Sequence, residues 1–545
     1  MLGLMQRQPL TISSLLTHAA RHHPETEIVS NTVEGPRHRY TWRDAERRAR
    51  RLARALDGLG VRRGDRVGTL AWNGYRHLEL YFAVPGIGAI LHTVNPRLFE
   101  DQIAFIVEDA GDRVLFAETS FVPLVERLVA RLRRRPRALV LLCDREHLPE
   151  IALPPGVVLH AYEDLLAAAP DDYAWPELDE ETASGLCYTS GTTGHPKGVL
   201  YSHRSTVLQA MAGNLADVFG LRAVDRVLPV VAMFHVNAWC LPYSAPMVGA
   251  TLILAGPRTD GASLHELIEA ERVTFAAAVP TVWLGLVQHL RASGGRVDGL
   301  ERACVGGAAC PAALLQALRD EYGVEVAQGW GMTETSSASA YNRPKPADAA
   351  LTGPDVDVLR LKQGRAMYGV DYRIVDATGA DLPWDGEVAG ELLVRGPRVC
   401  RAYYRAGRDA VDGDGWFRTG DIVTIDPSGY VQITDRAKDL IKSGGEWISS
   451  IELENVAMSH PDVAEAAVIA AKHPRWDERP LLLVVAKPGH HPEPQALLDW
   501  YRERVASWQV PDAALVVPEL PHTATGKLLK TALRERYGTY LLDQT

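Results

Sequence analysis

The sequence contains one stretch that decides how the rest is interpreted: Tyr188-Thr189-Ser190-Gly191-Thr192-Thr193-Gly194-His195-Pro196-Lys197-Gly198. Its three glycines let the backbone turn sharply and bring N–H groups close to an anion. Its four Ser and Thr hydroxyls add donors and can reach a magnesium ion, and Lys197 adds a point charge that suits phosphate. The stretch therefore predicts a loop that holds the phosphates of a nucleotide.

This loop differs from a Walker A motif, which needs G-x-x-x-x-G-K-[ST] at the start of a helix. Here Pro196 precedes Lys197, and Gly198 follows it. Because proline disfavours helix at the residue before it, we expect a hairpin-like loop with residues 199–201 as the returning strand. The alternative is an ordinary Gly/Thr-rich surface turn, and the later segments weigh against it.

The composition is that of a soluble globular protein, with 46% hydrophobic and 23% charged residues among 545. This length suggests three or four folding units, and the net charge of −10 argues against a general nucleic-acid binder. Arg7 and Pro9 interrupt any signal-peptide core, and no apolar run is long enough to span a bilayer. The six cysteines form no C-x-x-C pair, so we expect reduced core residues and a cytoplasmic protein.

Two basic clusters interrupt the acidic average, one within residues 43–54 and one within 131–137. One interpretation is that these clusters bind anions, either at a membrane surface or in the phosphates of coenzyme A. We favour solvated helix faces, with Leu52, Leu56 and Leu59 on the buried side of the first. Peripheral membrane contact is left open.

The order of expected elements predicts an α/β protein with a β-rich subdomain and a small α+β domain at its C-terminal end. Helical and buried strand-like runs alternate from residue 40 to about 305, which implies parallel strands. From about Val370, short strands alternate with turns such as 376–379 and 426–429. A compact α+β pattern follows Asp435. We therefore expect an N-terminal domain over 1–434 and a C-terminal domain over 435–545.

A second segment whose residues suggest a binding function is Gln328-Gly329-Trp330-Gly331-Met332-Thr333-Glu334-Thr335. The paired glycines leave open faces beside Trp330, whose indole can stack on adenine. Glu334 is a hard oxygen ligand of the kind that Mg²⁺ prefers. A core tryptophan beside a turn is the alternative. Three further segments carry chemistry-bearing residues: Arg418-Thr419-Gly420-Asp421, 435–446 and 521–527.

Together these segments resemble the adenylate-forming superfamily, which includes acyl-CoA synthetases, adenylation domains and luciferases. The resemblance runs from about Tyr40 to Lys530 and is closest to fatty acyl-CoA synthetases and the ligases that activate 3-methylthiopropionate. It implies ATP, Mg²⁺ and coenzyme A as cofactors, and a C-terminal domain that rotates between two half-reactions. The family often has tyrosine where this chain has Trp330.

The resemblance also implies a role for individual residues. The phosphate loop is Thr189, Ser190, Gly191, Thr192, Thr193, Gly194 and Lys197, with Thr189 and Glu334 binding Mg²⁺. The nucleotide contacts are Gln328, Gly329, Trp330, Gly331, Thr333, Arg436 and, at the ribose, Asp421. Lys438 is the hinge pivot, Lys442 a second candidate cation, and Gly444 and Gly445 approach the pantetheine tunnel. Lys527 meets the carboxylate and the α-phosphate in the adenylation step only.

The acyl site is expected at two apolar segments. His235 is placed by the substrate carboxylate, beside Val236 and with Trp239 as a gate of the acyl tunnel. The run 305–309 has no large side chain, so Gly306 and Gly307 can lie against a ligand. A histidine on an apolar segment is often a satisfied core residue, and that interpretation of His235 stays open. We name Lys527, His235, Glu334 and Thr189 as candidate catalytic residues.

The sequence thus predicts an ATP-dependent acid–CoA ligase that forms acyl-AMP and then acyl-CoA. Its acid is expected to be a medium- or long-chain fatty acid, or a short aliphatic acid such as 3-methylthiopropionate. The alternatives are an adenylating enzyme that delivers to a carrier protein and a non-catalytic nucleotide-binding sensor. The resemblance to the long-chain branch also leaves a homodimer open.

Overall fold

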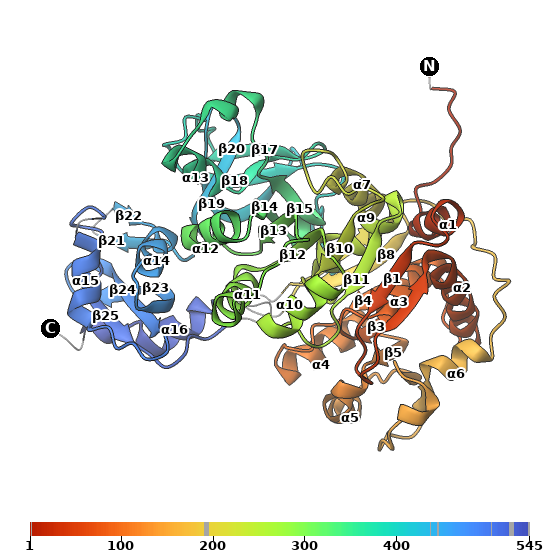
Figure 1. Ribbon diagram of the computed structural model, residues 1–545. Helices are drawn as coiled ribbons and strands as arrows, with labels where there is room; N and C mark the ends of the chain where they lie inside the picture. The colour runs from red at the N-terminus through yellow and green to blue at the C-terminus, as the bar shows by residue number, and fades with distance from the viewer. Residues whose placement is uncertain are drawn as a thin grey trace.

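The computed structural model describes residues 1, 3–189, 196–436, 438–443, 446–502, 504–522 and 528–542. Over these residues the strands form a seven-stranded, a thirteen-stranded and a five-stranded sheet. The five-stranded sheet belongs to the C-terminal part, which Figure 1 shows in blue beside the rest of the chain. The predicted α/β class, with a β-rich subdomain and a small C-terminal unit, is confirmed.

The seven-stranded sheet has the order β7-β6-β5-β3-β4-β8-β9 and is parallel except for its last pair. The strands are β3 (Arg66–Leu70), β4 (Ile90–Thr93), β5 (Val114–Ala117), β6 (Ala138–Leu141), β7 (Val158–Ala161), β8 (Ala183–Tyr188) and β9 (Gly198–Ser202). Three central strands, β4, β5 and β6, are buried along their whole length, as expected when helices cover both faces of a parallel sheet. The expected hairpin around the phosphate loop is present, since β8 and β9 pair antiparallel.

Helices cover this sheet on its two faces. The helices are α2 (Trp42–Gly58), α3 (Tyr75–Gly86), α4 (Glu100–Ala110), α5 (Val122–Arg131) and α6 (Tyr162–Ala167). Residues of α4 and α5 share one core with β5 and β6, and residues of α2 and α3 share another. Helix α2 begins at a capping box, in which the Thr41 hydroxyl accepts the N–H of Asp44.

Helix α3 is buried along its whole length because it lies between the two large sheets. The helix begins at Tyr75 and contains Pro85 in its last turn. The turn is kept by the Ile87 N–H, which donates to the Ala83 carbonyl at 3.2 Å.

The thirteen-stranded sheet has the order β17-β18-β19-β20-β16-β15-β14-β13-β12-β10-β11-β1-β2. Its strands are β1 (Glu27–Ser30), β2 (His38–Thr41), β10 (Arg226–Pro229), β11 (Thr251–Leu254), β12 (Phe275–Ala278), β13 (Arg302–Gly306), β14 (Glu325–Met332), β15 (Ser337–Tyr341), β16 (Gly364–Ala366), β17 (Asp371–Val375), β18 (Gly390–Arg395), β19 (Phe417–Ile425) and β20 (Tyr430–Arg436). Neighbouring strands from β1 to β14 are parallel, and those from β14 to β17 are antiparallel. The change of direction occurs at β14, which carries Gln328 to Met332.

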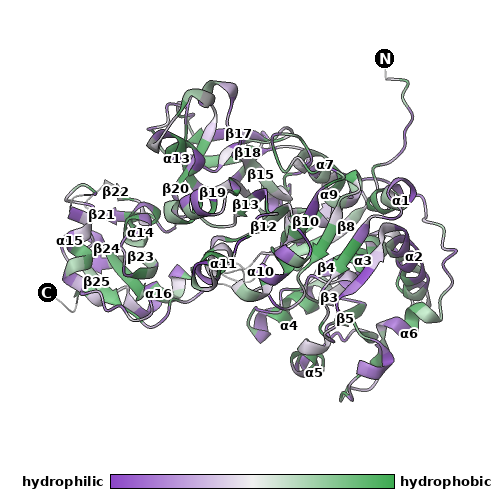
Figure 2. Cartoon of the chain, viewed as in Figure 1, coloured by the Kyte–Doolittle hydropathy of each residue, from purple (hydrophilic) through white to green (hydrophobic). Residues whose placement is uncertain are grey.

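Helices also pack on both faces of this sheet. They are α1 (Ile12–His22), α7 (His203–Gly213), α8 (Val236–Trp239), α9 (Leu241–Val248), α10 (Gly261–Ala270), α11 (Pro280–Ser293), α12 (Ala312–Gln316) and α13 (Pro354–Arg360). Residues of α10 and α11 belong to one core, and residues of α1, α7 and α9 belong to the core that contains α3. Figure 2 shows the hydrophobic residues gathered on the strands inside these layers.

The C-terminal unit has its own sheet and two cores of its own. Its elements are β21 (Ile441–Ser443), β22 (Glu446–Ile448), α14 (Ser450–Met458), β23 (Val463–His473), β24 (Asp477–Ala486), α15 (Pro494–Arg502), β25 (Ala513–Val516) and α16 (Lys530–Tyr537). Helices α14 and α15 pack on one face and α16 on the other. Within the described parts of the chain, no helix is long and apolar enough to cross a membrane.

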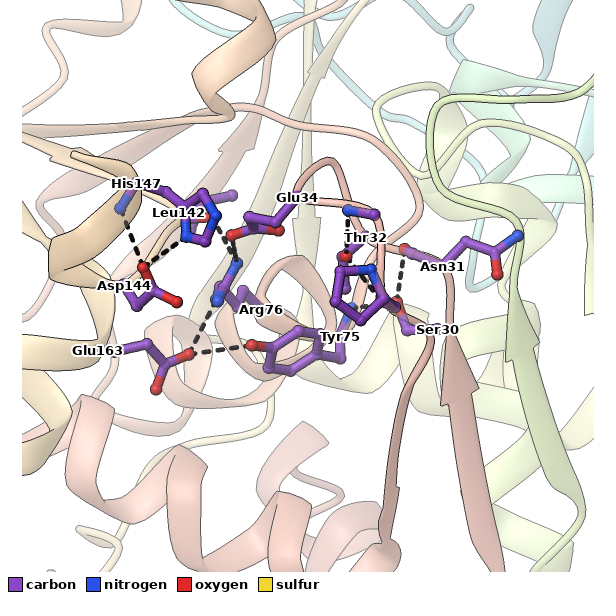
Figure 3. A network of polar contacts seen from close by, with 12 residues as sticks. Ser30, Asn31, Thr32, Glu34, Tyr75, Arg76, Leu142, Asp144, His147 and Glu163 are labelled. Atoms are coloured by element: carbon purple, nitrogen blue, oxygen red, sulfur yellow. Dashed lines mark hydrogen bonds and ion pairs between the residues drawn. The ribbon is translucent and has the colours of Figure 1, made fainter. Parts of the chain in front are cut away.

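A buried polar network ties the N-terminal elements together (Figure 3). Arg76 of α3 pairs with Glu34 at 2.6 Å and with Glu163 of α6 at 2.8 Å, and it donates to the Leu142 carbonyl. The arginines of α2 also pair with carboxylates, as Arg48 does with Glu79 and Glu163. The first basic cluster is therefore a helix face in which ion pairs offset the charge, and Leu52 and Leu56 are buried as expected.

Candidate active site

A cavity of about 280 Å³ opens at the carboxyl ends of β13 and β14, where the thirteen-stranded sheet changes from parallel to antiparallel. Ligands of open α/β sheets bind at the carboxyl ends of strands. Many of the predicted residues line this cavity: Thr189, Lys197, His235, Val236, Trp239, Gly306, Gly307, Gly329, Trp330, Gly331, Thr333, Glu334 and Arg436. The structure therefore brings together segments that lie far apart in the sequence.

The two residues that flank the predicted phosphate loop, Thr189 and Lys197, line the cavity. The Thr189 N–H donates to the Lys197 carbonyl at 2.9 Å, which closes the neck of the loop between β8 and β9. Ser190, Gly191, Thr192, Thr193 and Gly194 lie outside the described residues, so their role stays a prediction.

Glu334 lies in a short 3₁₀ turn, Thr333–Thr335, directly after β14. Its side chain lines the cavity but is only 6% exposed, and this burial raises the pKa of the carboxyl. The Tyr403 hydroxyl donates to Glu334 Oε1 at 2.7 Å, and the Cys400 N–H donates to the Glu334 carbonyl. A carboxylate and the Thr189 hydroxyl on one wall are hard oxygen donors, which fits Mg²⁺.

Trp330, Asp421 and Arg436 form a linked group, in which Trp330 and Arg436 line the cavity and the buried Asp421 does not. The Trp330 indole N–H donates to Asp421 Oδ2 at 2.9 Å, and Arg436 Nε contacts Asp421 Oδ1 at 2.8 Å. Asp421 is only 1% exposed, so both carboxylate oxygens are held from the protein side. Trp330 therefore replaces the lost phenol of the more usual tyrosine with an N–H donor to the predicted ribose ligand.

The apolar side of the cavity is built on an unusual backbone. Five successive residues from Val236 to Cys240 have positive φ, between 37° and 69°, and none is glycine. L-amino acids disfavour this left-handed conformation by roughly 1–2 kcal/mol per residue. The turn places Val236 and Trp239 on the cavity wall, directly after His235.

At two nearby positions, Gly306 and Gly331, the surrounding atoms leave no space for a side chain. A Cβ atom on Gly306 would lie 3.0 Å from Trp239 Cη2 and 2.9 Å from the Gly329 carbonyl oxygen. A Cβ atom on Gly331 would lie 1.9 Å from the Ser337 carbonyl oxygen. The Trp239 ring and the Gly329 carbonyl therefore require glycine at position 306, while the predicted contact of Gly306 with a ligand stays a prediction.

Several predicted residues lie away from the cavity wall that the described residues form. Gln328 is buried and does not line the cavity. Its side chain accepts the Cys310 N–H and so links β14 to the segment after β13. Lys442 is in β21, and Lys438 lies between β20 and β21. Gly444, Gly445 and Lys527 fall outside the described residues.

The cavity also has residues that the sequence interpretation missed. They are Phe219, Cys304, Met332, Ser337, Ala338, Tyr341, Tyr403, Phe417, Arg418 and Thr419. Arg418 and Thr419 belong to the quoted segment before Asp421, which was the available signal. Phe219, Tyr341 and Tyr403 carry no local pattern, because packing between distant segments places them there.

The chemistry of this wall suits an anionic nucleotide beside an apolar group. Lys197, Arg418 and Arg436 supply positive charge. Phe219, Cys304 and Tyr341 supply apolar surface. The two kinds of surface share one cavity, as a reaction between a phosphate and an acyl group would require.

Comparison with known proteins identifies the family. The family model described as AMP-binding enzyme matches residues 16–404, and the model of the AMP-binding enzyme C-terminal domain matches residues 452–527. The first model includes the loop, the β14 segment and the left-handed turn. The second covers most of the C-terminal unit.

Individual relatives cover nearly the whole chain. The medium-chain-fatty-acid–CoA ligase of Ectopseudomonas oleovorans is 48% identical over 99% of this chain and 98% of its own length. The 3-methylmercaptopropionyl-CoA ligase of Ruegeria lacuscaerulensis is 49% identical over 98% of this chain and 99% of its own length. Among solved structures, the anthranilate CoA ligase AuaEII in complex with anthranoyl-AMP matches with a TM-score of 0.86 at 26% identity, covering 99% of this chain and 100% of that chain.

Proposed function

This chain belongs to the family of AMP-binding enzymes, and from that premise we propose that it is an acid–CoA ligase whose adenylation step occurs in the 280 Å³ cavity. The observation that supports this proposal is that the candidate residues for binding phosphate, metal and the acyl group all line one cavity. Relatives at 48–49% identity over nearly the full chain are ligases of fatty acids and of 3-methylmercaptopropionate. ATP and coenzyme A are the cosubstrates that such a reaction needs.

We assign the nucleotide side of the cavity to ATP. Lys197 and the loop after Thr189 bind the phosphates, the Trp330 face stacks on adenine, and Asp421 accepts the ribose hydroxyls. The Glu334 carboxylate and the Thr189 hydroxyl would hold Mg²⁺, which reduces the negative charge of the phosphates when bound. Glu334 and Thr189 line the same cavity as Lys197, which supports this arrangement.

The reaction then proceeds by two substitutions. A carboxylate oxygen attacks the α-phosphorus, the bond from that phosphorus to the bridging oxygen breaks, and pyrophosphate leaves. The sulfur of coenzyme A next attacks the acyl carbonyl carbon, AMP leaves and the thiol proton is released. In this scheme His235 faces the carboxylate, while Lys527 stabilises the charge on the carboxylate and α-phosphate in the first step only.

We propose an aliphatic acid as the substrate, with Trp239 limiting its length. Trp239 lines the 280 Å³ cavity and also a second, mainly apolar cavity of about 90 Å³ behind it. Trp72, Phe234 and Val279 contribute to the second cavity, which also shares His235 and Gly307 with the first. A longer acyl chain would extend past Trp239 into this second cavity, whereas a short acid would end before it.

We also propose that the chain divides near residue 435 into a nucleotide-binding domain and a mobile C-terminal domain. Two adjacent residues support this division. The Asp435 carboxylate accepts the N–H and the hydroxyl of Ser450 at the start of α14, whereas Arg436 contacts Asp421 of β19. Both residues end strand β20 of the thirteen-stranded sheet, and the Asp435 side chain already bonds the C-terminal unit, so the link between the two units lies at the end of this strand.

The first test is a panel of acids with ATP, Mg²⁺ and coenzyme A, analysed by mass spectrometry. The panel runs from acetate to palmitate and includes benzoate and 3-methylthiopropionate. Acyl-CoA would establish the ligase and identify its acid. Acyl-AMP without thioester would point to delivery to a carrier protein, and no product from any acid would favour the nucleotide-binding sensor.

A Lys527→Ala variant separates the two half-reactions. We expect acyl-AMP formation to fall at least about a hundredfold, because one charge contact to the reacting phosphate is lost. Thioester formation from supplied acyl-AMP should stay within about threefold of wild type, a change worth less than about 1 kcal/mol. A variant that lost both activities equally would contradict the assigned role of Lys527.

A further inference from the structure

The segment 400–404 crosses between two parts of the proposed active site. The Cys400 N–H donates to the Glu334 carbonyl at 2.7 Å. The Tyr404 N–H donates to the carbonyl of Gly198, the first residue of β9, also at 2.7 Å. The backbone of this segment therefore links the Glu334 turn to the strand that leaves the phosphate loop.

The side chain of Tyr403 lies between these two anchor points. Its hydroxyl donates to Glu334 Oε1 at 2.7 Å, and its ring centroid lies 4.9 Å from Lys197 Nζ. The ring also packs against Phe417, with 6.3 Å between the ring centroids. Tyr403 is half-buried and lines the cavity.

The two contacts of Tyr403 have different physical origins. The hydroxyl restricts the orientation of a carboxylate that is almost fully buried, where an unbonded oxygen would be unfavourable. The ring attracts the Lys197 ammonium through its negative face, an interaction of about 0.5–2 kcal/mol depending on exposure. One rigid side chain thus contacts both the candidate metal ligand and the lysine of the phosphate loop.

We propose that Tyr403 is a positioning residue for the adenylation step, which sets the separation between the Glu334 carboxylate and the Lys197 ammonium. The proposal rests on the proposed function, because it takes Glu334 as a ligand of the nucleotide-bound metal. Tyr403 itself touches neither reacting atom in this scheme. Its effect passes through the two groups that it holds.

The chain offers a graded set of variants to test this. Tyr403→Phe keeps the ring over Lys197 and removes the hydroxyl donor, whereas Tyr403→Leu removes both. Tyr404→Phe is the matched control, since the Tyr404 side chain lies beside Arg405 and only its backbone bonds to Gly198. Calorimetric melting of each variant reports whether the fold is kept.

The measurement is calorimetric binding of an ATP analogue with a methylene group between the α- and β-phosphorus, over a range of Mg²⁺ concentrations. We expect Tyr403→Phe to raise the Mg²⁺ concentration for half-maximal binding about tenfold, as for groups that orient metal ligands. Binding without Mg²⁺ should stay unchanged in Tyr403→Phe and weaken in Tyr403→Leu. Tyr404→Phe should match wild type in both conditions.

A double variant decides whether Tyr403 acts through Glu334. In the Glu334→Gln background, Tyr403→Phe should add no further shift, because the carboxylate that it orients is absent. Additive shifts, or an unchanged Mg²⁺ requirement in Tyr403→Phe, would overturn the proposal. So would a wild-type protein whose binding does not depend on Mg²⁺. These results are independent of the acid panel, whose failure would instead reject the ligase function.

Discussion

Trp330 lines the cavity, and its indole N–H donates to the buried Asp421. The donor holds Asp421, which is buried and is also contacted by Arg436. A tyrosine at this position would present its phenol at a different point from the indole N–H. The substitution relative to the more usual family residue therefore changes which group orients the proposed ribose ligand.

We expect Trp330→Phe to raise the KM for ATP about tenfold. The change leaves Asp421 Oδ2 without its donor in a buried site, and such a loss is worth about 1–3 kcal/mol. Steady-state kinetics with varied ATP measure the effect. Trp384→Phe is the control, because that indole is exposed. An unchanged KM for ATP would show that Asp421 is oriented without Trp330.

Trp239 is the side chain between the two cavities, and its removal should lengthen the accepted acid. In Trp239→Ala we expect the ratio of kcat/KM for the longest over the preferred acid to rise about tenfold, since each buried methylene is worth roughly 1–3 kcal/mol. The same acid panel measures this ratio, with Trp384→Ala as control. A ratio that falls or stays constant would place the acyl chain elsewhere.

No pattern in the sequence predicts the left-handed turn from Val236 to Cys240. It contains no glycine, although five successive positive φ angles favour glycine. Strain of this kind is kept only where the surrounding packing determines the backbone. Ala238 is fully buried inside the turn, so the packing around it holds the conformation.

We expect Ala238→Gly to be less destabilising than Ala245→Gly by about 1–2 kcal/mol. Both changes remove one buried methyl group, so that loss cancels in the comparison. The conformational entropy that glycine adds to the unfolded chain is also common to both, so the difference is the left-handed strain of about 1–2 kcal/mol, which glycine relieves at position 238 and which is absent at position 245 in helix α9. Urea unfolding midpoints measure both. Equal losses would contradict a strained turn.

Elements that are bounded by turn residues close in the sequence could be predicted. Elements that are held by packing between distant segments could not. Thr251–Leu254 is one of the alternating buried strands that the sequence indicates between residues 40 and 305, because a short apolar run between turn residues is typical of a strand. The hairpin neck at Thr189 and Lys197 follows from nearby glycines and Pro196. The Tyr403–Glu334 contact joins residues 69 positions apart, so no local pattern indicates it.

At the scale of the whole molecule, the polar network around Arg76 links elements of several layers (Figure 3). Glu118 follows β5 near this network, and burial raises the pKa of its carboxyl to about 8, from an ordinary value of 4.5. Arg76 opposes this shift, and Glu34 adds to it. The stability of the fold should therefore depend on pH in this range.

The direction follows from where the proton is bound. Between about pH 4.5 and 8 the folded protein keeps the Glu118 proton and the unfolded chain loses it, so the contribution to stability is full below pH 4.5 and falls as pH rises to 8. Glu118→Gln stays neutral, and we expect it to be more stable than wild type at pH 8 by on the order of 3 kcal/mol. Urea unfolding at pH 5, 6.5 and 8 measures this, with the exposed Glu150→Gln as control. Parallel pH profiles for Glu118→Gln and wild type would contradict it.

The pairing of β1 with β11 has a consequence for synthesis of the chain. Ile28 of β1 lies opposite Leu252 of β11, so the β1–β2 hairpin completes its sheet only after residue 254 has been made. At about 5–20 residues per second, the ribosome needs roughly 10–45 seconds to add the intervening chain. During that interval the nascent chain exposes a strand edge that invites association with other chains. Newly made protein should therefore depend on chaperones until β11 leaves the ribosome.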